Sequence, residues 1–362
     1  MFSDVYRGRK VLITGHTGFK GSWLAFWLKE LGAELCGIAL PMETEYSHFD
    51  LLKPGMRSEI SDIRDRERIA EIVADFRPEA VFHLAAQPLV RRSYREPVET
   101  FAANVMGTTH VLDACRGTDS VRAVVAVSSD KCYENTGRKE GYKESDPMGG
   151  HDPYSASKGC TELVISSYRR SFFAPEEYGK KHHLLLASAR AGNVVGGGDW
   201  AEDRLVPDMM KAAAAGKTVT IRSPKSTRPW QHVLEPLSGY LALGARLLAG
   251  EKAFARGWNF GPSDGGNIPV EEVVSAFAKA WDAVRYRIDP PADAPHEAAL
   301  LALDCSQAAR ELAWHSVWTP EETFARTAAW YRDFYASGKL RTADDIAAYI
   351  LSAQKEGLSW TK

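Results

Sequence analysis

The feature that most constrains this chain is a loop of evenly spaced glycines near its start. Gly15, Gly18 and Gly21 lie between the apolar run 10–14 and the amphipathic stretch 20–31. The run predicts a buried strand, and the stretch predicts a helix with one apolar face. Glycines in such a turn let backbone N–H groups approach a pyrophosphate at the helix N-terminus. A plain strand–helix turn is the alternative, but this position in the chain favours a dinucleotide site.

The rest of the first half alternates strands with helices. Apolar runs predict further strands at 34–40, 80–84, 121–128 and 184–190, and helical periodicity predicts helices at 64–76, 97–115 and 152–173. Strands alternating with helices indicate βαβ units, and continuous apolar strands indicate a sheet covered on both faces. The expected fold class is therefore α/β, with a Rossmann-type doubly wound parallel sheet.

A second, loop-rich region begins after about residue 192, where glycine, proline and tryptophan become frequent. We expect a smaller α/β domain for the substrate there. The predicted division assigns residues 1–190 and 233–262 to an NAD-binding domain. It assigns residues 191–232 and 263–350 to the substrate domain.

Composition excludes several function classes. The chain carries 45 Lys plus Arg against 47 Asp plus Glu, so it lacks the basic excess of a nucleic-acid binder. No apolar run reaches the roughly 18 residues that would span a membrane, and no secretory signal is recognisable. The five cysteines are widely spaced without a CxxC pair, which predicts neither a zinc site nor a disulfide framework. We expect a cytoplasmic protein without a metal.

The GxxGxxG spacing resembles that of the extended short-chain dehydrogenase/reductase superfamily, which implies a nicotinamide cofactor. The usual ribose-binding acid is missing from 38–40, and Glu43 is the nearest one. No Arg or Lys stands between Cys36 and Leu52 to hold a 2′-phosphate, so NAD is favoured over NADP. Asp62 lies at the position, after the third strand of the superfamily's fold, where the superfamily holds adenine. A helix N-cap explains Asp62 equally well. The expected cofactor contacts are Gly15, Thr17, Gly18, Phe19, Lys20, Gly21, Asp62, Ile63, Leu84, Ala85, Ala86, Asn104, Ser128, Tyr154 and Lys158.

Tyr154 and Lys158 form a YxxxK pair on a predicted helix, where residues i and i+4 share a face. A lysine ammonium near a phenol favours the phenolate, which lowers the tyrosine pKa and makes a general base for a sugar hydroxyl. The pattern is common by chance, and an exposed Tyr and Lys on a helix is the alternative. Ser129, at the end of the strand 121–128, would complete a Ser/Tyr/Lys set, with Ser128 facing the cofactor.

Asp130 and Lys131 follow Ser129 directly. A simple reductase or epimerase needs no extra acid at this position, whereas an enzyme that expels water from a sugar needs a proton donor for the leaving hydroxyl. A strand-end cap or an ion pair with Lys131 is the structural alternative for Asp130.

Long motifs across most of the chain resemble the nucleotide-sugar 4,6-dehydratases, and their CDP-sugar branch in particular. They are GHTGFKGSW (15–23), FHLAAQPLVRRSY (82–94), NVMGT (104–108), SSDKCYEN (128–135), MGGHDPYSASKG (148–159), ARAGNVVGGGDWAEDRLVPD (189–208) and RPWQHVLEPLSGYL (228–241). The resemblance implies oxidation of CDP-glucose at C4, loss of water across C5–C6, and return of the hydride to C6. The 4-keto-6-deoxy product would serve deoxysugar and surface-polysaccharide synthesis.

The resemblance also implies roles for single residues. Asp130 matches the acid of the relatives' Asp–Glu pair, but Lys131 stands where the Glu base belongs. We predict that Lys131 contributes to the elimination, with an electrostatic or structural role as the alternative. The helices 97–115 and 152–173 form dimer interfaces in relatives, so we expect a homodimer, possibly a tetramer.

The anionic substrate needs cations. Arg204, Arg222 and Arg228 lie in the second region, and arginine suits bidentate phosphate contact. The family contacts the substrate diphosphate at the position of Asn193. Gln87 and Arg92 are weaker candidates for the sugar, and each arginine could equally form a surface ion pair.

Three alternative functions remain open from the sequence. They are a dehydratase for another nucleotide, a nucleotide-sugar 4-epimerase, and a non-catalytic NAD-binding regulator. The regulator would be expected to lack the complete Ser129, Tyr154 and Lys158 set.

Overall fold

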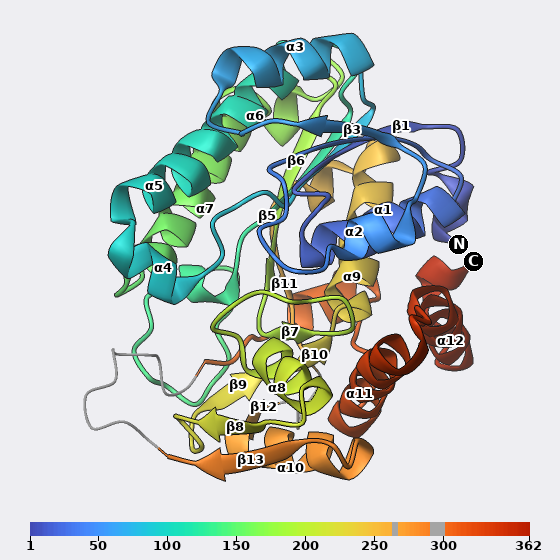
Figure 1. The fold of residues 1–362 in the computed structure, drawn as a ribbon. Coiled ribbons are helices and arrows are strands. Elements are labelled where there is room, and N and C mark those ends of the chain that lie inside the picture. The colour runs from blue at the N-terminus through green and yellow to red at the C-terminus, as the bar shows by residue number, and fades with distance from the viewer. Residues whose placement is uncertain (263–266, 290–300) are drawn as a thin grey trace.

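A seven-stranded parallel sheet forms the centre of the protein in a computed structural model, which describes residues 1–262, 267–289 and 301–362 (Figure 1). The strand order is β3-β2-β1-β4-β5-β6-β11, and every neighbouring pair is parallel. The strands are β1 (Lys10–Thr14), β2 (Glu34–Ala39), β3 (Arg57–Ile60), β4 (Ala80–His83), β5 (Ala123–Val127), β6 (Leu185–Ala191) and β11 (Gly257–Phe260).

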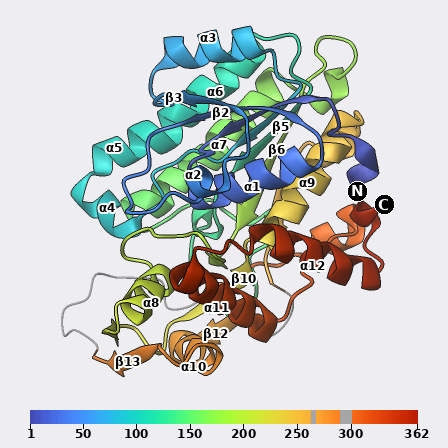
Figure 2. The same ribbon diagram turned by 45° about the vertical axis from the view of Figure 1, so that its right-hand side comes forward.

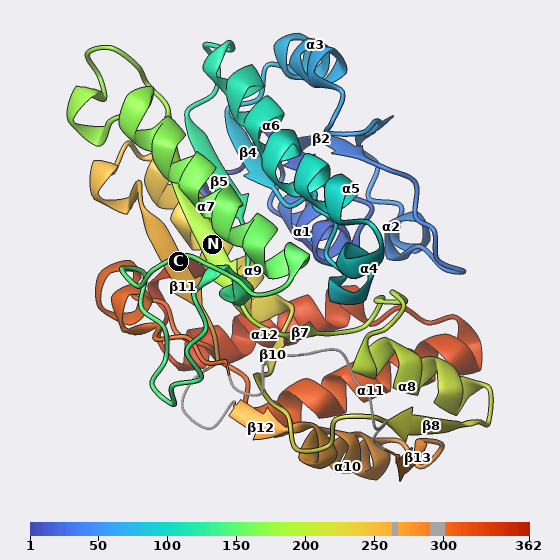
Figure 3. The same cartoon turned by 90° about the vertical axis from the view of Figure 1, so that its left-hand side faces the viewer.

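Helices cover both faces of this sheet, as its continuously apolar strands require, because successive side chains point to opposite faces. Leu12 of β1 belongs to a core with α3, α6 and α7, whereas its neighbours Val11 and Ile13 pack in a core with α1 and α9 (Figure 3). These helices are α1 (Phe19–Glu30), α3 (Arg66–Phe76), α6 (Gly107–Arg116), α7 (Pro153–Ser171) and α9 (Leu234–Leu248). The predicted fold class, a doubly wound Rossmann-type sheet, is confirmed.

The strand order reverses between β1 and β4. The chain runs outward from β1 through β2 to β3, then returns to pair β4 with the other side of β1. In open α/β sheets, ligands bind at the carboxyl ends of the strands at such a switch point. The topology therefore predicts a ligand site at the residues just after β1, β4 and β5.

The helix predicted at 97–115 is divided into three parts. It consists of α5 (Pro97–Phe101), a π-helical turn (Ala102–Met106) and α6. The carbonyl of Asn104 accepts hydrogen bonds from the hydroxyls of Thr108 (2.6 Å) and Thr161 (3.0 Å). These two hydroxyls therefore donate to a backbone carbonyl within the π-helical turn, where the regular α-helical hydrogen bonding is interrupted. Two further short helices flank this region, α2 (His48–Leu52) and α4 (Val90–Arg95).

The remaining elements form a smaller lobe below the sheet lobe in Figure 1. Short strands pair two by two: β7 with β10 and β8 with β13 in parallel, and β9 with β12 antiparallel. Their bounds are β7 (Val194–Val195), β8 (Thr218–Ile221), β9 (Thr227–Pro229), β10 (Gln231–His232), β12 (Asn267–Pro269) and β13 (Arg285–Ile288). The accompanying helices are α8 (Leu205–Ala214), α10 (Val270–Ala280) and α11 (Pro320–Ser337).

The last helix, α12 (Thr342–Lys355), packs back towards the sheet lobe (Figure 2). The Tyr349 hydroxyl of α12 donates to buried Glu235 of α9 (2.7 Å), and the Tyr349 ring contacts Trp27 of α1. Part of the predicted substrate region, 263–266 and 290–300, lies outside the described residues. No helix in the described ranges combines the length and apolarity needed to cross a bilayer.

Candidate active site

The glycine loop forms a tight backbone cradle between β1 and α1. Gly15 adopts a left-handed φ of +78°, and a Cβ there would lie 2.8 Å from the backbone nitrogen of Ala85. A Cβ on Gly21 would lie 2.0 Å from the Gly15 carbonyl oxygen, so α1 can approach the loop only with glycine here. Gly18 is the N-cap of α1 and offers no side-chain cap. The first backbone N–H groups of α1 are thus left for an anion, as the sequence predicts.

The ends of β4 and β5 complete this edge of the sheet. Leu84 and Ala85 follow β4 and bond back to Thr14, through its carbonyl (3.1 Å) and its hydroxyl (3.2 Å). The backbone of Ala85 is one of the walls that leave no room for a Cβ at Gly15. The three predicted strand-end segments therefore meet beside the start of α1.

Ser129 and Asp130 lie in a short turn directly after β5, and both are buried. The Ser129 hydroxyl donates to Asp130 Oδ1 (2.9 Å) and accepts the backbone N–H of Lys131 (3.2 Å). Asp130 Oδ2 is buried and has no hydrogen-bond partner among the described residues. A carboxylate oxygen in that state costs free energy unless a ligand supplies the missing donor.

Tyr154 and Lys158 lie in the first turns of α7, and both are buried. Asp152 caps this helix by accepting the N–H of Ser155 (2.9 Å), and Pro153 starts it. The Tyr154 hydroxyl shares a hydrogen bond with Ser129 and feels the charge of Asp130. The predicted Ser129, Asp130 and Tyr154 are thus brought together.

Burial shapes the ionisation of these groups. Burial raises the pKa of Tyr154 to about 12, although its hydrogen bond with Ser129 opposes the rise. Burial also lowers the pKa of Lys158 to about 8. The expected lowering of the tyrosine pKa is therefore wrong for the protein by itself, because desolvation of the phenolate outweighs the hydrogen bond with Ser129 and the positive charge of Arg204.

Lys20 lies closer to the catalytic groups than its place in the glycine loop predicts. Its ammonium lies 6.0 Å from the centre of the Tyr240 ring, and burial lowers its pKa to about 7. Asp130 opposes that lowering, whereas the positive charges of Arg204 and Lys158 add to it. Three cations and one carboxylate therefore share the region around Tyr154.

A buried polar network lies beneath the catalytic helix. Glu162, one turn after Lys158, accepts Ser128, Ser188 (2.8 Å) and the Arg190 guanidinium (2.8 Å). Arg190 also donates to the Tyr133 hydroxyl (2.6 Å), just after the Asp130 turn. Glu162 follows Lys158 by four residues and so shares its face of α7. This spacing is the sequence signal that could have identified Glu162.

Several predicted cofactor residues are engaged elsewhere. The Ser128 hydroxyl donates to Glu162. The Asn104 side chain binds the backbone of Gln87 (2.8 and 3.1 Å) and the Ser157 hydroxyl (2.8 Å). Asp62 accepts the N–H of Arg64 (2.8 Å) in the turn before α3, whose N-cap is Asp65, so the helix-cap alternative for Asp62 is wrong. These side chains form hydrogen bonds within the protein and support the carboxyl edge of the sheet. Ile63 is buried next to Gly107, and Thr17 donates to the Leu40 carbonyl (2.9 Å).

The predicted substrate residues divide into two groups. Gln87 bonds to Leu89 and Thr100, and Arg92 forms partly exposed ion pairs with Glu96 (2.8 Å) and Glu43 (3.1 Å).

The second group is the three arginines and Asn193 of the second region, of which Arg204 lies near Tyr154. Arg204 pairs with Asp199 (2.9 Å) within electrostatic reach of Tyr154. Arg228 is buried in β9, Arg222 follows β8, and Asn193 precedes β7.

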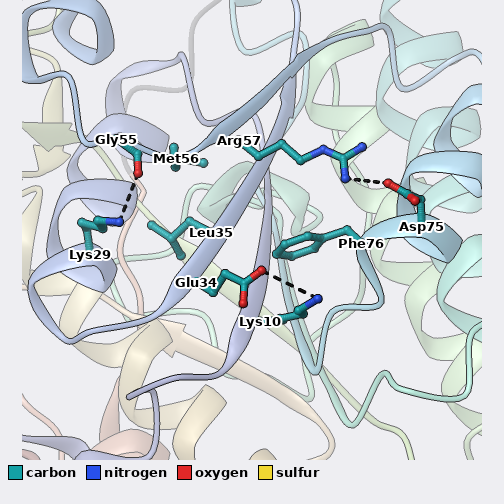
Figure 4. Close-up of a pocket in the computed structure, with 9 residues that line it drawn as sticks. All are labelled: Lys10, Lys29, Glu34, Leu35, Gly55, Met56, Arg57, Asp75 and Phe76. Atoms are coloured by element: carbon teal, nitrogen blue, oxygen red, sulfur yellow. Dashed lines mark hydrogen bonds and ion pairs between the residues drawn. The ribbon is translucent and has the colours of Figure 1, made fainter.

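Surface hollows occur away from the reacting groups. Figure 4 shows one of about 600 Å³ at the amino ends of β1, β2 and β3. Its charges are paired with one another, Lys10 with Glu34 (3.7 Å) and Arg57 with Asp75 (2.6 Å). It lies at the opposite end of the strands from Ser129, so it is not the active site. The described residues contain no cluster of three or more His, Cys, Asp or Glu side chains suited to a metal.

Comparison with known proteins agrees with this geometry. The sequence model of the family described as GDP-mannose 4,6 dehydratase matches residues 12–327. The chain is 50% identical to a CDP-glucose 4,6-dehydratase of Salmonella typhimurium, over 91% of this chain and 92% of that one. It is 28% identical to a dTDP-glucose 4,6-dehydratase of Streptomyces antibioticus, over 89% of this chain and 92% of that one.

Solved structures share the fold. A dTDP-glucose 4,6-dehydratase of Streptomyces venezuelae with NAD bound superposes with a TM-score of 0.74 at 24% identity, covering 90% of this chain and 97% of that one. A UDP-glucose 4-epimerase of Thermus thermophilus in complex with NAD gives 0.75 at 25% identity, covering 89% and 99%. The family match and the 50% identity over nine-tenths of both chains lead to one conclusion: this chain belongs to the nucleotide-sugar 4,6-dehydratase family.

Proposed function

We propose that this protein converts CDP-glucose into CDP-4-keto-6-deoxyglucose and water. The observation that carries the proposal is the buried Asp130 next to Tyr154 and Ser129, which puts a second proton donor or acceptor beside the tyrosine that would take the 4-hydroxyl proton. The 50% identity to a CDP-glucose 4,6-dehydratase supports the choice of nucleotide.

NAD fits the glycine cradle. The cradle has no room for a Cβ at Gly15 or Gly21, and the N-terminus of α1 lacks a side-chain cap. Gly15, Thr17, Gly18 and the first turn of α1 would hold the pyrophosphate. Bound NAD⁺ would supply the hydride acceptor for C4 and, after elimination, the hydride donor for C6.

Oxidation at C4 requires removal of the 4-hydroxyl proton. Tyr154 would take this proton, with Ser129 holding the same hydroxyl through the hydrogen bond that now joins the two side chains. Lys158 would stabilise the tyrosinate, because its charge is on the same face of α7. Because burial raises the pKa of Tyr154 to about 12, a further positive charge would help the proton to leave.

Elimination then requires one base and one acid. The new 4-ketone acidifies the C5 proton. We assign the removal of this proton to Lys131, which is half-buried in the turn after Ser129. Asp130 would protonate the 6-hydroxyl as it leaves as water, using the oxygen that has no partner among the described residues. Return of the hydride to C6 and of a proton to C5 completes a redox-neutral reaction.

The smaller lobe would hold the nucleotide sugar. Arg228 is buried and the Arg204 side chain is one-third exposed, and guanidinium groups suit the diphosphate. Residues 191–232 and 263–350 would form this substrate domain, while β11 and α9 complete the cofactor domain around the sheet.

We also propose a cytoplasmic homodimer. Helices α5 and α7 lie side by side (Figure 3), and each carries an exposed apolar side chain, Val98 of α5 (75% exposed) and Leu163 of α7 (61%). Large exposed apolar side chains on adjacent helices mark an interaction surface. A second copy of the same face would bury them in a helical bundle.

The test is incubation of the purified protein with NAD and, separately, CDP-glucose, dTDP-glucose, UDP-glucose and GDP-mannose, followed by mass spectrometry. CDP-glucose should lose one water and the others should react much more slowly. An unchanged mass with an inverted C4 would identify a 4-epimerase instead. Faster dehydration of another nucleotide sugar would overturn the choice of CDP.

A further inference from the structure

Two arginines from different lobes converge on one carboxylate. Arg91 of α4 lies 3.5 Å from Asp203 Oδ1, and Arg222, just after β8, lies 3.8 Å from the same oxygen. The side chains of Arg91 and Asp203 are about one-third exposed, at 33% and 31%. Asp203 therefore joins the sheet lobe to the smaller lobe through two cations.

This cluster lies beside the catalytic tyrosine. Arg91 is two residues from Ser93, whose hydroxyl accepts the backbone N–H of Tyr154 (3.1 Å). Asp203 directly precedes Arg204, which is within electrostatic reach of the Tyr154 hydroxyl. A sugar bound at Tyr154 would thus carry its diphosphate close to Arg91 and Arg222.

The backbone of Asp203 adopts a left-handed φ of +56°. This conformation costs free energy for any residue with a Cβ, although Asp and Asn tolerate it better than others. Such a conformation persists where the surroundings hold the residue, and it clusters at ligand sites. Here the two arginines hold the side chain.

We propose that the carboxylate of Asp203 occupies the place that the substrate diphosphate takes between Arg91 and Arg222. This inference rests on the proposed function, and it adds Arg91 and Asp203 to the substrate site. A carboxylate and a phosphate offer arginine similar paired oxygens, so one can stand in for the other. On binding, the diphosphate replaces Asp203, which turns towards solvent.

Because of this exchange, an anion must carry enough negative charge to displace Asp203. A diphosphate brings more negative charge than one carboxylate and displaces it, whereas a monovalent anion does not. The carboxylate also keeps the two arginines oriented, because they would otherwise repel each other.

The test is calorimetric titration of CDP, with cytidine as the probe that lacks phosphates. Asp203→Asn should bind CDP about threefold to tenfold more tightly, because two partly exposed ion pairs no longer compete. Cytidine affinity should not change. Asparagine tolerates the left-handed backbone, and an unchanged melting temperature would verify the fold. Glu202→Gln removes the same charge from the same loop and is the matched control, with no expected gain.

Arg91→Gln should weaken CDP binding about fivefold and reduce the gain from Asp203→Asn when the two are combined. Unchanged or weaker CDP binding by Asp203→Asn, or an equal gain from Glu202→Gln, would overturn the inference. If the unaltered protein binds no CDP but binds another nucleoside diphosphate, the choice of CDP fails, and the Asp203 comparison is then made with that nucleotide.

Discussion

The buried ion pair beneath the catalytic helix allows a quantitative prediction for Glu162→Gln. The change keeps the shape of the side chain and removes its charge. Glu162 and Arg190 are 3% and 6% exposed and 2.8 Å apart, so the guanidinium would remain buried without a counter-charge. Breaking such a pair on one side costs about 3–5 kcal/mol. The amide oxygen can still accept one hydrogen bond, so we take the lower value, about 3 kcal/mol.

The assay is thermal unfolding monitored by circular dichroism at one scan rate. A loss of about 3 kcal/mol should lower the melting temperature by about 4 °C in a protein of this size. The double variant Glu162→Gln with Arg190→Met removes both charges and should recover at least half of the loss. Glu177→Gln is the matched control, because its pair with Lys181 (3.4 Å) is largely exposed and should change stability by less than about 1 kcal/mol.

The same variant has a signature in the pH profile. Burial lowers the pKa of Lys158 to about 8, and the negative charge of Glu162 limits this lowering. Without that charge, the pKa of Lys158 falls further, and the lysine loses its proton at a lower pH. Activity should therefore decrease more at pH 8 than at pH 6.5. A melting temperature equal to that of the unaltered protein, or a double variant less stable than the single one, would refute the reasoning.

Three further predictions follow from the site and its surface. Lys131→Ala should retain C4 oxidation, seen as absorbance at 340 nm, while dehydration falls by about 10²–10⁴; near-normal turnover would contradict the assignment of the C5 base. Gly21→Ala should weaken NAD binding by more than about tenfold because its Cβ would meet the Gly15 carbonyl, whereas Gly18→Ala, with 3.3 Å available, should weaken it less in the same titration. Leu163→Lys combined with Val98→Glu should convert the dimer into a monomer by light scattering, and a monomeric unaltered protein would contradict the proposed interface.

Much of the sheet lobe could be predicted because its strands are locally encoded. The run 10–14 is apolar throughout, and the structure has β1 at Lys10–Thr14. The spacing of glycines after it requires a close approach of α1, which the geometry at Gly21 confirms. By contrast, β3 is a short polar edge strand, Arg57–Ile60, whose sequence carries no apolar run.

The roles of single side chains were harder to predict because their partners are distant in the chain. Ser128 bonds to Glu162, and Asn104 bonds to Gln87 and Ser157. Nothing near Ser128 in the sequence indicates that α7 brings a carboxylate beneath it. The same holds for Lys20. Its motif indicates a phosphate-binding loop, but its ammonium interacts electrostatically with Asp130.

The network around Glu162 has a consequence for how enzymes of this kind can diverge. It ties β5, β6 and α7 together through Ser128, Ser188 and Arg190, and it reaches β11 where the Tyr133 hydroxyl donates to Asn259 (2.7 Å). The proton-transfer groups are therefore carried as one rigid unit. The arginines that would meet the nucleotide lie largely on separate segments outside that unit. A descendant of this protein could acquire a different nucleotide preference through a few substitutions in those segments and inherit the chemistry unchanged.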